Sequence, residues 1–191
     1  MRDYVSARVN SIPPSGIRKF FDIAATMKDV ISLGIGEPDF TTPDSIIKAG
    51  IDSLQHGETH YTSNSGTIEL RRSLNGYLQR RYGLEYDPEA ELLITVGVSE
   101  ALYLALTAIL DAGDEVITSP FTFIATYNSI LTHKALPVFA DTDPATLTMD
   151  PASIESRVTE RTRVILPVHI FGMPCDMDPI NAIAKKHNLA V

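Results

Sequence analysis

The spacing of hydrophobic positions changes about half-way along the chain. Before residue 88, apolar side chains recur every three or four positions, which predicts helices over 16–27, 42–57 and 66–83. From Glu91 onward, short runs rich in valine, isoleucine and leucine alternate with segments of helical spacing. These runs read ELLITV, DEVITS, ALPVFA, TRVILPVH and NLAV.

Strands that alternate with helices are typical of βαβ units, so we predict an α/β fold with a mostly parallel sheet and helices on both faces. The chain then divides into an N-terminal arm and helical segment, residues 1–88, and an α/β core, residues 89–191. The segment Ser99–Leu110 is apolar nearly all round, which favours a helix buried between the sheet and another layer. The closing segment AIAKKHNLAV opens a strand and stops, so we expect a chain that normally continues.

Composition narrows the class of protein. With 44% hydrophobic and 21% charged residues, the 191-residue chain is expected to be soluble and globular. A formal charge of −8 argues against nucleic acid or an acidic membrane as partner. The single cysteine, Cys175, fits a reducing cytoplasm and indicates a structural thiol. Because we see neither a signal peptide nor an apolar run long enough to span a bilayer, we predict a cytoplasmic protein.

The stretch TVGVSEAL predicts an anion site. In an open parallel sheet, ligands bind beyond the carboxyl ends of the strands. Here a strand is predicted to end at Val96 and a helix to begin near Ser99, so the N–H groups of Gly97, Val98 and Ser99 can face one phosphate. The alternative is that Ser99 is only a helix cap.

Further candidate residues follow the carboxyl ends of the predicted strands, but each of them alone is weaker evidence for a ligand site. Phe123 can cover a flat ligand, or be a packing residue. His169 can donate a hydrogen bond to such a ligand, or be structural. The motifs DTDP and DMDP carry paired carboxylates, but Asp-Pro favours a turn over a metal site, and we predict no metal. Gly34-Ile35-Gly36 lacks the third glycine of a nicotinamide-binding motif.

Longer motifs resemble two families. SIPPSGIRKFFDIAATMKDVISLGIGEPDFTTPDSI, HYTSNSGTIELRRSL and ITVGVSEALYLALTAILDAGDEVI resemble class I/II aminotransferases, pyridoxal-phosphate enzymes of fold type I. That resemblance covers residues 6–118. Residues 119–191, from SPFTFIATYNSI onward, instead resemble the DegT-type nucleotide-sugar aminotransferases. Both families share one large-domain fold, so the resemblance implies an aminotransferase with a chimeric sequence.

The resemblance implies roles in a pyridoxal 5'-phosphate site. Gly97, Val98 and Ser99 match the phosphate-binding turn, and Phe123 matches the ring that stacks on the pyridine. His169 falls near the position beside the cofactor's 3-oxygen, although the motif around it follows the sugar-type pattern.

Two further positions concern the substrate and a partner subunit. Gly36 matches backbone near the substrate carboxylate, and Tyr61 matches a tyrosine that reaches the phosphate of the neighbouring subunit. The resemblance therefore implies a homodimer that uses a small-molecule amino donor and a keto acceptor. The resemblance to class I/II aminotransferases implies a keto acid as acceptor, and the resemblance to DegT-type enzymes implies a keto sugar.

Two catalytic residues of these families are absent from the matching motifs. Fold type I transaminases need an aspartate at the pyridine nitrogen and a lysine that binds the cofactor covalently. In both families these residues follow the last position matched here, so we name no catalytic residue and predict a chain that is inactive alone. The alternative is a non-catalytic truncated or chimeric α/β domain with at most weak phosphate or cofactor binding.

Overall fold

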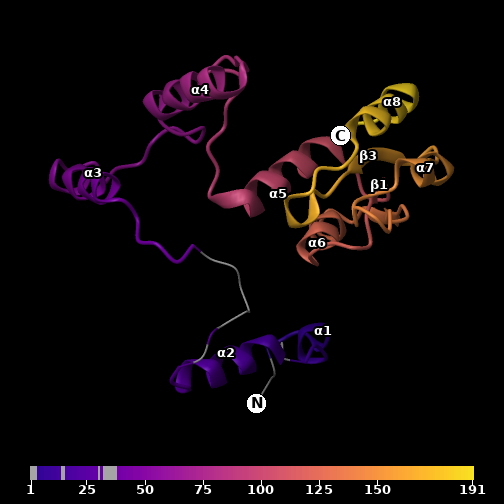
Figure 1. Ribbon diagram of the computed structural model, residues 1–191, viewed down its shortest axis with the longest axis horizontal. Helices are drawn as coiled ribbons and strands as arrows, with labels where there is room; N and C mark the ends of the chain where they lie inside the picture. The colour runs from indigo at the N-terminus through magenta and orange to yellow at the C-terminus, as the bar shows by residue number, and fades with distance from the viewer. Residues whose placement is uncertain (1–3, 14–15, 30, 32–37) are drawn as a thin grey trace. The chain divides into compact units, whose positions relative to one another are not determined.

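The computed structural model describes residues 4–13, 16–29, 31 and 38–191 (Figure 1). It separates into two compact units, Met1–Tyr61 and Thr62–Val191. Each unit is described by itself. The domain boundary near residue 88 stays a prediction.

The first unit contains α1 (Ala7–Asn10), α2 (Gly16–Thr26) and α3 (Asp44–Gln55). Ser6 caps α1, since its hydroxyl accepts the Val9 N–H at 3.3 Å. Pro43 directly precedes α3, at a helix start where a missing N–H costs nothing. Neither α1 nor α3 has a buried residue, so these helices contribute no core of their own.

The second unit begins with α4 (Ile68–Tyr82), whose ends are well specified by sequence. The Thr67 hydroxyl caps its start, and Gly83 ends it in the left-handed region at φ 69°. Buried Arg71 donates from Nη1 to the Pro88 carbonyl at 2.7 Å. This bond ties α4 to the segment that leads into the α/β core.

The core contains a three-stranded parallel sheet in the order β2-β1-β3. Its strands are β1 (Glu115–Thr118), β2 (Leu136–Phe139) and β3 (Thr162–Leu166). Beside β3, Ala190 makes an isolated parallel bridge to Val164. The predicted α/β fold with a parallel sheet is confirmed.

Helices cover both faces of this sheet (Figure 1). On one side lie α5 (Gly97–Ile109) and α6 (Ala125–Thr132), and on the other lie α7 (Pro151–Ile154) and α8 (Met177–His187). Two short 3-10 turns, η1 (Glu155–Arg157) and η2 (Ile170–Gly172), follow α7 and β3 respectively.

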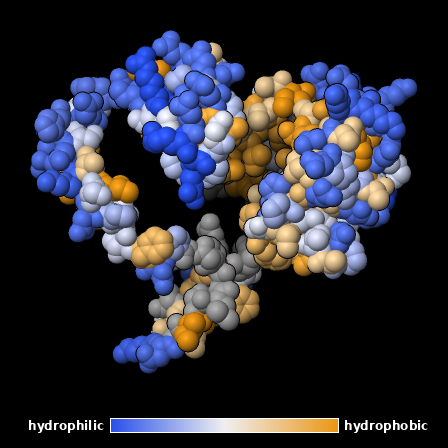
Figure 2. All heavy atoms as spheres, turned by 45° about the horizontal axis from the view of Figure 1, so that its top comes forward, coloured by the Kyte–Doolittle hydropathy of each residue, from blue (hydrophilic) through white to orange (hydrophobic). Residues whose placement is uncertain are grey.

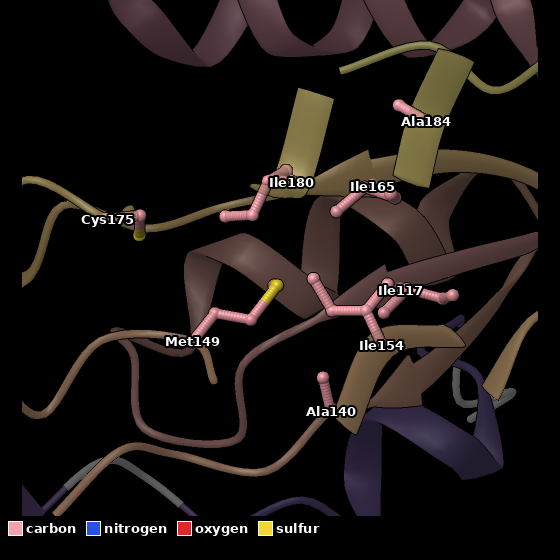
Figure 3. Close-up of a cluster of buried hydrophobic side chains, with 8 residues drawn as sticks. All are labelled: Ile117, Ala140, Met149, Ile154, Ile165, Cys175, Ile180 and Ala184. Carbon is pink, nitrogen blue, oxygen red and sulfur yellow. The ribbon is translucent and has the colours of Figure 1, made fainter. Parts of the chain in front are cut away.

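Alternation along the strands divides the apolar side chains between two cores. Val116 and Val164 face α5 and α6, whereas Ile117 and Ile165 face α7 and α8. Figure 3 shows the second core, in which the side chains of Ile117, Ile154, Ile165, Ile180 and Met149 point toward one another. Since all five are fully buried, each contributes roughly 2–3 kcal/mol of hydrophobic stabilisation.

Two expectations from sequence are wrong. Residues 91–96, ELLITV, form no strand, and Ile94 instead donates its N–H to the Ser65 carbonyl at 3.1 Å. A parallel strand needs a paired strand for its ladder, and among the described residues no strand pairs with this segment. The helix α5 is not buried between two layers. Only Leu106 within it is buried, while apolar side chains on its other side are exposed and gather at the surface in Figure 2.

No helix among the described residues combines the length and the apolar content that a bilayer crossing requires.

Candidate active site

The carboxyl-terminal edge of the sheet gathers the predicted site residues of the second unit. β1 ends at Thr118 and β3 at Leu166, and α5 and α6 begin at this same edge. Helices whose N-termini meet at one edge present free backbone N–H groups and positive partial charge there. The edge is therefore suited to an anionic ligand.

The start of α5 is open to such a ligand. Gly97 has φ 79°, and a Cβ added there would meet no atom within 4 Å, so the backbone conformation rather than crowding requires glycine. The Glu100 carboxylate folds back and accepts the Val96 N–H at 2.5 Å. No side chain caps the helix, and the Ser99 hydroxyl has no hydrogen bond among the described residues. This donor set suits a phosphate monoester.

Two hollows flank α5 and share Leu102 as a lining residue. One, of about 270 Å³, runs between α5 and α6 from Ser99 to His133. The other, of about 230 Å³, lies between Leu102, Thr126 and the segment Leu166–His169. Ser99 and His169 thus border adjoining spaces at one edge of the sheet.

The position of His169 is fixed by the loop that follows it. Its Nδ1 accepts the Cys175 N–H at 3.0 Å, so the ring proton of neutral His169 lies on Nε2. The Cys175 thiol is buried and donates to the Val168 carbonyl at 3.2 Å, as a structural residue does. His169 itself is exposed, which leaves Nε2–H able to donate to a ligand.

Three phenylalanines stand at this edge. Phe123 is 75% exposed, and Phe121 and Phe171 meet edge to face with ring centroids 6.1 Å apart. Phe171 adopts φ 53°, an unfavourable conformation for a bulky residue, and its ring is largely exposed. The Phe123 ring is therefore not buried by the described residues, and its contact with a ligand stays a prediction.

The other predicted positions are not joined to this group. Tyr61 is fully exposed in the first unit, which is described separately. Gly36 and the neighbouring Gly34 lie outside the described residues. The Asp143 carboxylate accepts the N–H groups of Ala145 and Thr146 at 2.7 and 3.0 Å, which is the turn role predicted for DTDP. In the described part of the chain, no group of three or more metal-ligating side chains forms.

Sequence reasoning did not single out several residues that line the hollows: Leu102, Tyr103, Thr126, Asn128, Ser129 and His133. They lie in helices or at a helix end, where residues of these types are common and do not indicate a binding site. The only signal was helical spacing on α5 and α6, which predicts a shared face but not a cavity.

Several known proteins resemble this chain in sequence and in fold. The chain is 42% identical, over its full length, to the putative aminotransferase YugH of Bacillus subtilis, of which it covers 51%. It is 52% identical over 94 residues, 49% of the chain and 25% of the relative, to a pleiotropic regulatory protein of Geobacillus stearothermophilus. The crystal structure of the aspartate aminotransferase from Rhizobium meliloti superimposes with a TM-score of 0.82 at 32% identity, covering 99% of this chain and 50% of that one.

In fold and in sequence the chain matches aminotransferases of the fold type I pyridoxal-phosphate architecture. The sequence profile of the DegT/DnrJ/EryC1/StrS aminotransferase family matches residues 89–191, and the chain belongs to that family. The relationship predicted from sequence is confirmed. The chain spans about half the length of the curated relatives it matches.

Proposed function

We propose that this chain carries the phosphate and ring contacts of the pyridoxal-phosphate site of an aminotransferase. The observation that supports this most is the start of α5, which no side chain caps, at the same edge of the sheet as exposed Phe123 and as His169, whose Nδ1 alone is hydrogen-bonded. When bound, pyridoxal phosphate supplies an electron sink through which an amino group can pass from an amino donor to a keto acceptor.

Each residue then has one task. The N–H groups of Gly97, Val98 and Ser99, with the Ser99 hydroxyl, bind the phosphate. Phe123 covers one face of the pyridine ring and restricts its tilt. His169 donates from Nε2 to an oxygen on the ring, because its Nδ1 is already occupied by the Cys175 N–H.

We further propose that these 191 residues do not transaminate by themselves. The lysines of the second unit lie at the amino-terminal edge of the sheet. Lys134 directly precedes the segment that enters β2, and Lys186, at the end of α8, pairs with Glu155. No lysine between residues 62 and 191 therefore stands at the edge that carries Ser99 and His169.

A homodimer is part of this proposal. Tyr61 is fully exposed, and among the described residues no hydrogen bond holds its hydroxyl. We propose that it donates to the phosphate bound by a second subunit. The keto acceptor is either a keto acid or a keto sugar, and Gly36 is proposed to lie near the substrate.

The test is to titrate the 191-residue chain with pyridoxal phosphate and then to reduce it with borohydride. We expect saturable binding that inorganic phosphate competes away, without a reduced adduct at one specific lysine and without turnover of amino donors. A stoichiometric adduct at one lysine, together with turnover, would show that the chain is a complete catalyst. Absence of saturable binding would refute the site itself.

A further inference from the structure

We infer that His133 is a positioning residue for the proposed cofactor site, because it clamps α6 to α5 and so sets the spacing between Ser99 and Phe123. The inference rests on the proposed function, since those two residues are its cofactor contacts. His133 itself touches neither the phosphate turn nor the ring position.

His133 bridges the two helices through both ring nitrogens. Nδ1 lies 2.7 Å from the Ser129 carbonyl of α6, which can only accept, so Nδ1 carries a proton. Nε2 lies 2.8 Å from the Thr107 hydroxyl and 3.1 Å from the Tyr103 carbonyl, both on α5. The imidazole therefore joins the last turn of α6 to the middle of α5.

A ring contact supports the same bridge. The Tyr103 and His133 rings lie 4.8 Å apart between centroids, tilted by 42°. The Thr107 hydroxyl also lies 2.6 Å from the Tyr103 carbonyl, so hydroxyl, carbonyl and imidazole form one compact polar cluster. Among the described residues, the two helices share no other side-chain hydrogen bond, and their side chains Leu106 and Ile130 belong to one buried apolar cluster.

The bridge acts on both ends of the proposed cofactor contact. Ser99 lies one helical turn before Tyr103 on α5, and Phe123 lies two residues before α6 begins. The two helices run side by side along a groove of about 270 Å³. Without the imidazole, α6 can slide or rotate along α5, and Phe123 moves relative to the phosphate turn. A small misplacement of this kind weakens binding to a rigid two-point ligand.

The test compares two ligands with the full 191-residue chain. Pyridoxal phosphate needs both contacts, whereas inorganic phosphate needs only the turn at Ser99. We expect His133→Phe, which keeps the ring but removes both nitrogens, to raise the Kd of pyridoxal phosphate about tenfold. The Kd of inorganic phosphate should change by less than about twofold. His133→Gln should restore most of the lost affinity, because its amide oxygen can still accept from the Thr107 hydroxyl, as the unprotonated Nε2 does.

Thr132→Val is the matched control. Thr132 lines the same groove, but its hydroxyl donates to the Asn128 carbonyl within α6, at 2.7 Å. This variant should leave both affinities unchanged. If His133→Phe raised the Kd of both ligands equally, or of neither, the positioning role would be overturned.

Two further measurements separate this inference from the proposed function. Ser99→Asp puts a carboxylate in the phosphate turn. If this variant binds neither pyridoxal phosphate nor inorganic phosphate, the proposed turn is supported independently of the result at His133. Amide hydrogen exchange tests the clamp without a ligand. His133→Phe should speed exchange in the last turn of α6 and near Thr107 severalfold, with α7 and α8 unchanged. Unchanged exchange would overturn the clamp even if wild-type chain bound no pyridoxal phosphate.

Discussion

The two edges of the core sheet treat their polar groups in opposite ways. At the amino-terminal edge, Glu115 is only 4% exposed, and its carboxylate accepts from the Thr159 hydroxyl at 2.5 Å and from Arg161 Nε at 2.9 Å. At the carboxyl-terminal edge, within the described residues, the Ser99 hydroxyl has no hydrogen bond and the Phe123 ring has no aromatic partner. One edge is closed by its own side chains, and the other is left open.

This difference suggests that one edge contributes mainly to folding stability and the other mainly to ligand binding. A buried carboxylate is tolerated only when its partners replace water, so the Glu115 network must be complete in the folded chain. Uncovered N–H groups and rings add little to folding, but they are available to a ligand. We therefore expect variants at the amino-terminal edge to change the free energy of unfolding, and variants at the carboxyl-terminal edge to change affinity.

The largest effect is expected from Ser99→Asp. A carboxylate at the start of α5 repels a phosphate dianion, so affinity for pyridoxal phosphate should fall at least about a hundredfold. Unfolding by urea should be nearly unchanged, because an acidic residue is favourable near a helix start. The control is Ser156→Asp, in η1. It adds the same charge away from the site, and an equal loss of affinity there would contradict a local phosphate turn.

Glu115→Gln should have the converse effect. It removes the charge that Arg161 and the two threonine hydroxyls surround, and it should lower the free energy of unfolding by about 2 kcal/mol. Affinity for pyridoxal phosphate should stay within about twofold of the wild-type value. Exposed Glu160, one residue before Arg161, provides the control as Glu160→Gln. The edges would not be independent if Glu115→Gln weakened binding as much as it weakened folding.

Low pH should remove the contribution of the Glu115 carboxylate to the free energy of unfolding. The Thr159 hydroxyl, and after it Arg161, hold the pKa of this carboxyl below its usual range. A lowered folded-state pKa means that stabilisation is fully present above the ordinary value of about 4.3 and is lost as pH falls through the folded-state pKa. The stability gap between wild type and Glu115→Gln should therefore be constant near neutrality and shrink steadily as pH falls below about 4.3. A gap that stayed the same throughout acid titration would show that packing, not charge, accounts for it.

Phe123→Ala tests the open edge at its ring contact. Loss of the ring should lower the affinity for pyridoxal phosphate about tenfold while leaving inorganic phosphate unaffected, because only the former has a face to cover. Stability should hardly change, since the side chain is mostly exposed. Leu131→Ala, a change at another exposed apolar residue, on α6, should alter neither affinity. Equal loss for both ligands would place Phe123 at the phosphate rather than the ring.

Much of this comparison was predictable from sequence, but not all of it. The strands β1, β2 and β3 were predicted because each apolar run has a neighbour to pair with. The run at residues 91–96 looks the same in composition and forms no strand, because pairing depends on a neighbour that local sequence does not specify. Likewise, α5 has apolar residues all round, which predicted a buried helix. It is buried on one side only, because no second layer among the described residues packs on its other side.

The candidate site divides in the same way. Sequence left open whether Ser99 binds an anion or only caps a helix. The start of α5 at Gly97 was predictable, although the strand expected before it does not form. The free side of His169 was not, since it depends on Nδ1 accepting the N–H of Cys175 six residues later. The clamp at His133 was also missed, because its partners Tyr103 and Thr107 lie about thirty positions away on another helix. Positions joined only by tertiary contacts leave no local pattern.

The smallest predicted effect is a gain of stability at the closed edge. Lys134 follows α6 with φ 59°, in the left-handed region, where its Cβ is strained, and its carbonyl accepts the Gly113 N–H at 3.0 Å. Lys134→Gly should relieve that strain and raise the free energy of unfolding by about 0.5–1 kcal/mol, net of the greater freedom of glycine in the unfolded chain. Lys134→Ala removes the same charge but keeps the Cβ, so it should give no gain in urea unfolding. A gain from alanine equal to that from glycine would show that the charge, not the backbone conformation, opposes folding here. The same pair of variants should leave phosphate affinity unchanged, because Lys134 lies at the edge opposite Ser99.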